Sequence, residues 1–135
     1  MSSYWILKTE PSTYSFDRLL KERTTVWDGV SNPLALKHLR EMAVGDKVLI
    51  YHTGNEKAAV GLAHVTRAAY PDPNDAKLVV VDLQADRPLP KPVPLAVVKA
   101  DSAFADLALV RMGRLSVVPV KREQWERLME MAGQG

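Results

Sequence analysis

Short β-prone segments, each ended by proline, glycine or a polar turn, dominate this chain and limit the folds open to it. These segments cover residues 4–8, 24–27, 47–52, 59–67, 78–84 and 115–118. The helical patterns between them are scattered and lack the regular strand–helix alternation of a parallel sheet. We therefore predict an α+β fold built on a small curled β-sheet or barrel, and we disfavour a doubly wound parallel sheet.

Helix signals occur at several places between the predicted strands. Ser15 is suited to cap a first helix, because its hydroxyl can accept from a free backbone N–H. Pro33 indicates the start of a second helix, with either Ser31 or Asn32 as the capping residue. Two further helices are predicted over residues 95–99 and 121–131.

Two segments carry the signature of irregular structure. Residues 70–74 contain two prolines and are predicted to form a loop, and the prolines at 88, 90, 92 and 94 predict an extended connector. Gly61 and Ala63 are small residues within a predicted strand. They indicate that another part of the chain, or a ligand, approaches one face of that strand closely.

Length, cysteine content and charge restrict the class of protein. At 135 residues with a formal net charge of +2, the chain is predicted to form a single domain over residues 1–135. It has no cysteine, which excludes thiol catalysis, disulfides and thiolate metal sites. The apolar run 4–7 is too short to span a bilayer, so we expect a cytoplasmic protein without a membrane partner. The weak charge predicts few phosphate contacts for any nucleic-acid partner.

The three tryptophans have different surroundings in the sequence. Trp125 falls on the apolar stripe of the last predicted helix and is expected in the core. Trp5 lies in the first predicted strand, where a core position is favoured over a pocket wall. Trp27 directly precedes Asp28 and Gly29, a turn signal, so we predict its indole near the rim of the domain. A flat ring beside polar groups suits a planar heterocycle such as a nucleobase.

Catalytic and metal-binding patterns are weak. The histidines at 38, 52 and 64 are isolated, without the spacing of metal ligands. His64 is predicted to be half-buried with a partner and His38 to be solvated, whereas His52 ends a strand, where a structural role and a ligand-binding role stay open. A triad of Ser31, Asp28 and His52 can be drawn, but no nucleophile elbow accompanies it. Neither a dinucleotide-binding nor a phosphate-binding glycine motif occurs. We predict no metal, no cofactor and no catalysis.

Several motifs, in the same order along the chain, resemble the EVE domain family. They lie at residues 4–11 (YWILKTEP), 14–15 (YS), 25–32 (TVWDGVSN), 44–52 (VGDKVLIYH), 60–61 (VG), 69–72 (AYPD) and 112–117 (MGRLSV). The resemblance runs from about residue 3 to residue 131. That family belongs to the PUA-like superfamily and is similar to the YTH domains, which read N6-methyladenine in RNA.

The resemblance implies a PUA-like β-barrel flanked by short helices, with a concave pocket for a flipped and often modified base. The residues that it assigns to this pocket are Lys8, Thr9 and Glu10 at the polar edge, Trp27 as the stacking wall, Asp28 and Asn32 beside it, Tyr51 and His52 on the barrel side, and Arg114 and Ser116 at the rim.

The chain departs from the common family motifs in three respects. Thr9 replaces a serine, and its added methyl group narrows the space beside the hydroxyl. Ser31 replaces an arginine that could have met a phosphate. YTH domains complete an aromatic cage with a second tryptophan, whereas residues 78–84 contain no aromatic residue here. The sequence therefore predicts one stacking ring.

The function expected from this resemblance is non-catalytic binding of nucleic acid, RNA or DNA, with one base held in the pocket. Stacking on one ring contributes about 1–3 kcal/mol, and extruding a base from a duplex costs about a few kcal/mol. Single-stranded nucleic acid, or an already loosened base, is therefore the favoured partner. Two alternatives stay open: a protein-interaction module on the same barrel, and a nucleotide-modifying enzyme with His52 as the first residue to test.

Overall fold

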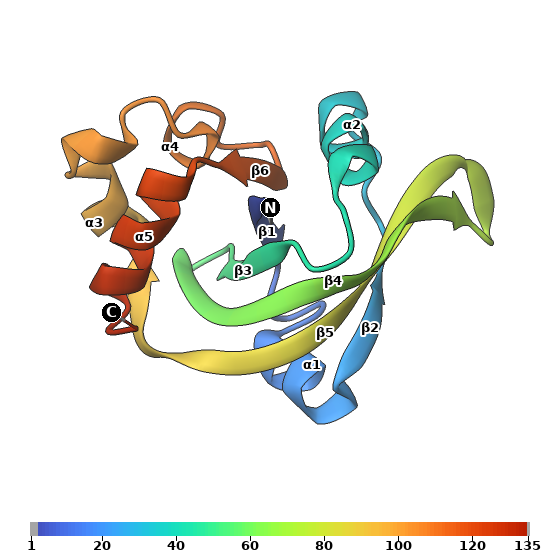
Figure 1. The fold of residues 1–135 in the computed structure, drawn as a ribbon, viewed down its shortest axis with the longest axis horizontal. Coiled ribbons are helices and arrows are strands. Elements are labelled where there is room, and N and C mark those ends of the chain that lie inside the picture. The colour runs from blue at the N-terminus through green and yellow to red at the C-terminus, as the bar shows by residue number, and fades with distance from the viewer. Residues whose placement is uncertain (1–2, 135) are drawn as a thin grey trace.

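The computed structural model describes residues 3–134, which form one mixed sheet with helices around it (Figure 1). The elements, in chain order, are β1 (Tyr4–Thr9), α1 (Phe16–Glu22), β2 (Thr24–Trp27), α2 (Pro33–Glu41), β3 (Lys47–His52), β4 (Ala58–Asp72), β5 (Asp75–Pro94), α3 (Leu95–Lys99), a 3₁₀-helix (Ser102–Phe104), α4 (Ala108–Arg111), β6 (Val117–Val120) and α5 (Arg122–Met131). No helix within residues 3–134 combines the length and apolar character needed to cross a bilayer.

The sheet has six strands in the order β2-β5-β4-β3-β1-β6. Strands β1 and β3 are parallel, and the other neighbouring pairs are antiparallel. The long strands β4 and β5 bend around the core (Figure 1), and their pairing contains several register shifts that increase the local bend. The predicted α+β class with a curled sheet is confirmed.

The predicted small curled barrel is only partly correct, because the sheet curls without closing. Within residues 3–134, β2 pairs with β5 alone and β6 with β1 alone, so these two strands remain edges. Each is four residues long. Strand β2 ends at the turn formed by Asp28 and Gly29, where Gly29 has a φ of +77°, so the edge that it offers is short. A gap is left between the two ends of the strand order.

The two segments predicted to be irregular belong to a long hairpin. Strand β4 continues to Asp72, and β5 begins at Asp75 opposite it. The prolines at 88, 90, 92 and 94 lie within β5. Strand β2 pairs with β5 only up to Gln84, so beyond that residue β5 has no β2 neighbour. A proline there removes no hydrogen bond from that side of the sheet, which is why it is tolerated.

The predicted helices form close to their expected bounds. The hydroxyl of Ser15 accepts from Arg18 N–H at 3.1 Å and caps α1. Asn32, rather than Ser31, caps α2, because its Oδ1 accepts from the N–H groups of residues 34 and 35 at 3.0 and 3.1 Å. The 3₁₀-helix and α4 were not predicted. Both are short. Asp101 caps the 3₁₀-helix by accepting from Ala103 N–H at 3.0 Å, whereas α4 has no capping side chain.

A buried carboxylate organises the core beneath β1. The side chain of Asp46 accepts from Trp5 Nε1–H at 3.0 Å and from the backbone N–H groups of Ser3 and Ala43, both at 2.9 Å. Asp46 and Trp5 are 3% and 5% exposed. A buried carboxylate persists only where such donors replace water. Trp5 is therefore a core residue, as favoured, and Trp125 is buried as predicted.

Helix α1 packs on the sheet through one close approach. The ring of Phe16 lies so near Gly61 on β4 that a Cβ at position 61 would sit 2.3 Å from it. The small residues at 61 and 63 predicted that another part of the chain, or a ligand, approaches this strand closely. At Gly61 the approaching group is the Phe16 side chain.

Replacing Gly61 with alanine should lower the free energy of unfolding by about 1–3 kcal/mol, because the added methyl group must displace a buried ring. Gly113 provides the matched control, since nothing lies within 4 Å of a Cβ placed there. Denaturant unfolding of Gly61→Ala and Gly113→Ala should show a loss only in the first. Equal stability of the two variants would contradict this packing.

Candidate nucleic-acid interface

A cleft of about 640 Å³ lies at the gap in the curled sheet. Its walls come from the end of β1 and the following loop, from α1 and from β2, with Ser116 just before β6 completing it. The lining residues thus belong to both ends of the strand order. We call it the seam cleft, and its lining residues are Lys8, Thr9, Glu10, Thr13, Tyr14, Arg18, Glu22, Thr25, Val26, Trp27, Asp28, Gly29, Val30 and Ser116.

Two aromatic rings meet in the wall of the seam cleft. Tyr14 and Trp27 have ring centroids 6.0 Å apart and planes at 86°, an edge-to-face arrangement. The predicted position of the Trp27 indole at the rim is wrong, because the residue is only 7% exposed. The turn after Trp27 does lie at the surface, but the last side chain of β2 points inward. A cleft nevertheless lies against this ring.

Charged groups on α1 hold the Tyr14 ring in place. Its hydroxyl donates to Glu22 Oε1 at 2.6 Å, and the Arg18 guanidinium lies 5.1 Å from the ring centroid and 3.2 Å from Glu22. Burial, and then the hydrogen bond to Glu22, raise the pKa of Tyr14 above its usual value. The same hydrogen bond lowers the pKa of Glu22. Near neutral pH the phenol therefore stays protonated and the carboxylate stays charged.

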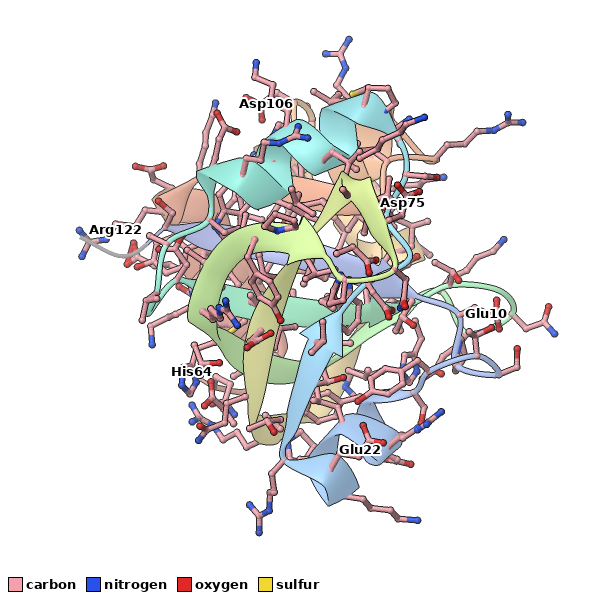
Figure 2. The ribbon with its side chains drawn as sticks, turned by 90° about the vertical axis from the view of Figure 1, so that its right-hand side faces the viewer. Glu10, Glu22, His64, Asp75, Asp106 and Arg122 are labelled. Atoms are coloured by element: carbon pink, nitrogen blue, oxygen red, sulfur yellow. The ribbon has the colours of Figure 1, made fainter. Side chains whose placement is uncertain are left out.

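The predicted polar edge lines the seam cleft, with some of its groups already engaged. Lys8 Nζ donates to Gly113 O at 3.0 Å, and partial burial lowers the pKa of this ammonium. The hydroxyl of Thr9 donates to Tyr14 O at 2.7 Å, so its hydrogen is used within the protein. Glu10 is exposed and lies on the loop after β1 (Figure 2). Its carboxylate accepts at 3.3 Å from the hydroxyl of Thr53.

Four of the residues assigned to the pocket lie outside the seam cleft. The Oδ1 atom of Asn32 is taken by the cap of α2. Tyr51 is 3% exposed and belongs to a separate depression beside Lys8. Arg114 is exposed and does not line the seam cleft. Ser116, which was also predicted at the rim, does line it.

His52 has a structural role in this fold. Its Nε2 accepts from Phe16 N–H at 3.0 Å, and its Nδ1 lies 2.8 Å from Glu56 Oε1. Both ring nitrogens are thus engaged, and the imidazole is 7% exposed. The ligand-binding alternative for His52 is not supported, since the backbone of α1 occupies its acceptor nitrogen. The other histidines follow the predictions in part: His64 is half-buried and pairs with Asp86 at 2.7 Å, while His38 is half-buried rather than fully solvated.

Tyr14, Arg18 and Glu22 are lining residues that the sequence analysis did not assign to the pocket. Tyr14 belongs to one of the family-like motifs, and that was the available signal. Arg18 and Glu22 are four residues apart on a predicted helix, a spacing typical of any exposed helix face. Only the packing of α1 beside β2 brings them to the seam cleft.

The electrostatics of the seam cleft are mildly acidic. Its charged residues are two cations, Lys8 and Arg18, and three carboxylates, Glu10, Glu22 and Asp28. Such a set offers acceptors at the edge of an aromatic wall, but it does not attract a polyanion by charge alone. No group of three or more His, Asp or Glu side chains within residues 3–134 is arranged to hold a metal ion.

Comparison with known proteins decides the family. The family model for the EVE domain matches residues 3–131. The chain belongs to the EVE domain family. The assignment predicted from the sequence motifs is therefore confirmed, and it covers nearly all of the chain that the structure describes.

Similar proteins share both the sequence and the fold of this EVE domain. The solution structure of Rpa0253 from Rhodopseudomonas palustris is 44% identical, with a TM-score of 0.92 over 97% of this chain and 93% of that one. The human THYN1 protein, in a crystal structure with DNA containing 5-methylcytosine, is 26% identical, with a TM-score of 0.89 over 99% of each chain. Human thymocyte nuclear protein 1 is 26% identical over 97% of this chain and 74% of its own length.

Replacing His52 with alanine should destabilise the EVE domain by about 1–3 kcal/mol, because a buried N–H of α1 loses its acceptor. The matched control is His64→Ala, which removes a half-exposed pair with Asp86 and should cost less than about 1 kcal/mol. Thermal or denaturant unfolding measures both. A larger loss for His64→Ala would contradict the structural role given to His52.

Proposed function

We propose that this EVE domain is a non-catalytic nucleic-acid-binding module, and that the seam cleft holds one base, preferably a modified one. The observation that carries the proposal is the pairing of two aromatic rings with carboxylates at the edge of an open cleft of about 640 Å³. That volume lies within the range of small-molecule sites, roughly 300–1,000 Å³. The human relative in complex with DNA containing 5-methylcytosine supports the choice of partner.

The aromatic wall supplies the attraction for a flat ligand. An extruded base enters the seam cleft and lies against the rings of Trp27 and Tyr14. Each stacking contact contributes about 1–3 kcal/mol. Because the two ring planes stand at 86°, a base that stacks on one ring meets the other edge to face, and that contact adds about 0.5–1.5 kcal/mol against the few kcal/mol that base extrusion costs. Single-stranded DNA or RNA, which pays less of that cost, remains the tighter ligand.

The acceptors at the edge of the cleft favour bases that carry an exocyclic amino group. Asp28 and Glu10 are exposed and line the cleft. Carboxylates accept hydrogen bonds from the N4 amino group of cytosine, whereas the O4 atom of thymine or uracil would face them acceptor to acceptor. A cytosine, including its 5-methylated form, therefore fits the polar edge better than a thymine does.

The absence of catalysis in this proposal rests on the candidate residues themselves. A triad through Asp28, Ser31 and His52 requires the imidazole to contact the serine hydroxyl. In the structure His52 instead contacts Phe16 N–H and Glu56. The imidazole is therefore not available as the base that activates a nucleophile.

Removing the Trp27 ring tests the proposal directly. Trp27→Leu should weaken binding of a short single-stranded DNA with one 5-methylcytosine by about 1–3 kcal/mol, roughly 5- to 150-fold. Trp125→Leu is the matched control, since Trp125 is equally buried, at 6% against 7%, but lies outside the seam cleft. Fluorescence anisotropy gives the dissociation constants, and circular dichroism confirms the fold.

Tyr14→Leu separates loss of binding from loss of folding, because Tyr14 is only half-buried. It should weaken binding in the same direction as Trp27→Leu while leaving the core intact. If both cleft variants bind as tightly as the wild-type chain, or if Trp125→Leu weakens binding as much as they do, the seam cleft is not the base site.

A further inference from the structure

A second hollow adjoins the seam cleft and shares one residue with it. This depression of about 180 Å³ has among its lining residues Lys8, Tyr51, Thr53, Gly54, Lys57 and Lys99. We call it the lysine depression. Lys8 lines both hollows, with its ammonium 5.9 Å from the Tyr51 ring centroid. A ligand in one hollow can therefore continue past Lys8 into the other.

The charge of the lysine depression is opposite to that of the seam cleft. Its lining includes three lysines and no carboxylate, and the Glu10 carboxylate lies at its edge, against Thr53 and Gly54. Within the described residues 3–134, none of these lysines has a carboxylate oxygen within 4.0 Å. Unpaired cations gathered around a hollow, in a chain whose net charge is only +2, form a local site for an anion.

The lysines are placed by ordered backbone rather than by a free loop. Leu95 N–H, at the start of α3, donates to Lys57 O at 2.8 Å. That bond joins the loop bearing Lys57 to the helix that ends at Lys99. On the other side, Thr53 N–H donates to Thr9 O at 2.9 Å. The hollow is therefore fixed relative to the end of β1, where the seam cleft begins.

We propose that the lysine depression binds the backbone phosphate next to the base held in the seam cleft, so that the strand runs from Trp27 past Lys8 toward Lys57 and Lys99. The proposal rests on the proposed function, because it places the rest of a strand whose base occupies the seam cleft. The acidic cleft reads the base, and the cationic hollow beside it holds the phosphate. Phosphate contacts of this kind fix position and strengthen binding without reading sequence.

Salt dependence tests the phosphate assignment. Each phosphate neutralised in a single strand contributes about 0.7 to the slope of log K against log[salt]. Lys57→Gln and Lys99→Gln should each reduce the slope for the 5-methylcytosine oligonucleotide by part of this amount, and the double variant should reduce it by more than either alone, up to about 0.7. Lys77→Gln is the control, because Lys77 lies on the β4–β5 hairpin, at the end of the molecule away from α3 (Figure 1). It should leave the slope unchanged.

Replacing single phosphates of the oligonucleotide with neutral analogues identifies which phosphate contacts the lysine depression. A methylphosphonate adjacent to the 5-methylcytosine, on one of its two sides, should weaken binding to the wild-type chain and have no further effect on the double variant. If the wild-type chain binds the oligonucleotide but the double variant shows the same salt slope, this inference is overturned and the proposed function still stands. No binding by the wild-type chain overturns both. A slope that falls equally in Lys77→Gln means diffuse attraction and also overturns the inference.

Discussion

Phe16 is held to the sheet from two sides, and the geometry of the candidate site depends on that anchor. Its ring packs against Gly61 on β4, while its backbone N–H donates to His52 at the end of β3. Both contacts fix the first turn of α1. Tyr14 lies immediately before this turn, so the same anchor sets its edge-to-face distance of 6.0 Å from Trp27. A shift of α1 would move one wall of the seam cleft relative to the other.

The open sheet provides the space that the anchored helix then shapes. A closed barrel would pair its edges and fill its interior with side chains. Here β2 and the pair β1–β6 stay apart, and polar groups from both ends face the gap. Figure 2 shows Glu10 on the loop after β1 and Glu22 on α1, the two segments that supply most of the charges. The two proposed binding sites follow from this placement: carboxylates of the seam cleft contact the base, and lysines of the neighbouring lysine depression contact the phosphate.

Local features of the sequence predicted most elements of the fold, because capping and strand alternation depend on near neighbours. Ser15 and the alternatives at the start of α2 are examples of this. The side chains that meet in the seam cleft depend on long-range packing. The turn after Trp27 correctly suggested a surface backbone but gave no information on where the ring points. Tyr14 could not be identified as the second ring, since only the packing of α1 beside β2 brings it there. Gly61 signalled a close approach, but the sequence did not say that Phe16 makes it.

The most direct test of the account is the contact between the base and the aromatic wall. Intermolecular nuclear Overhauser effects should be measured between the 5-methyl group of a single 5-methylcytosine in single-stranded DNA and the isotope-labelled EVE domain. The account predicts cross-peaks from that methyl group to ring protons of Trp27 or Tyr14. A saturated complex in which the methyl group contacts only residues outside the seam cleft would contradict it.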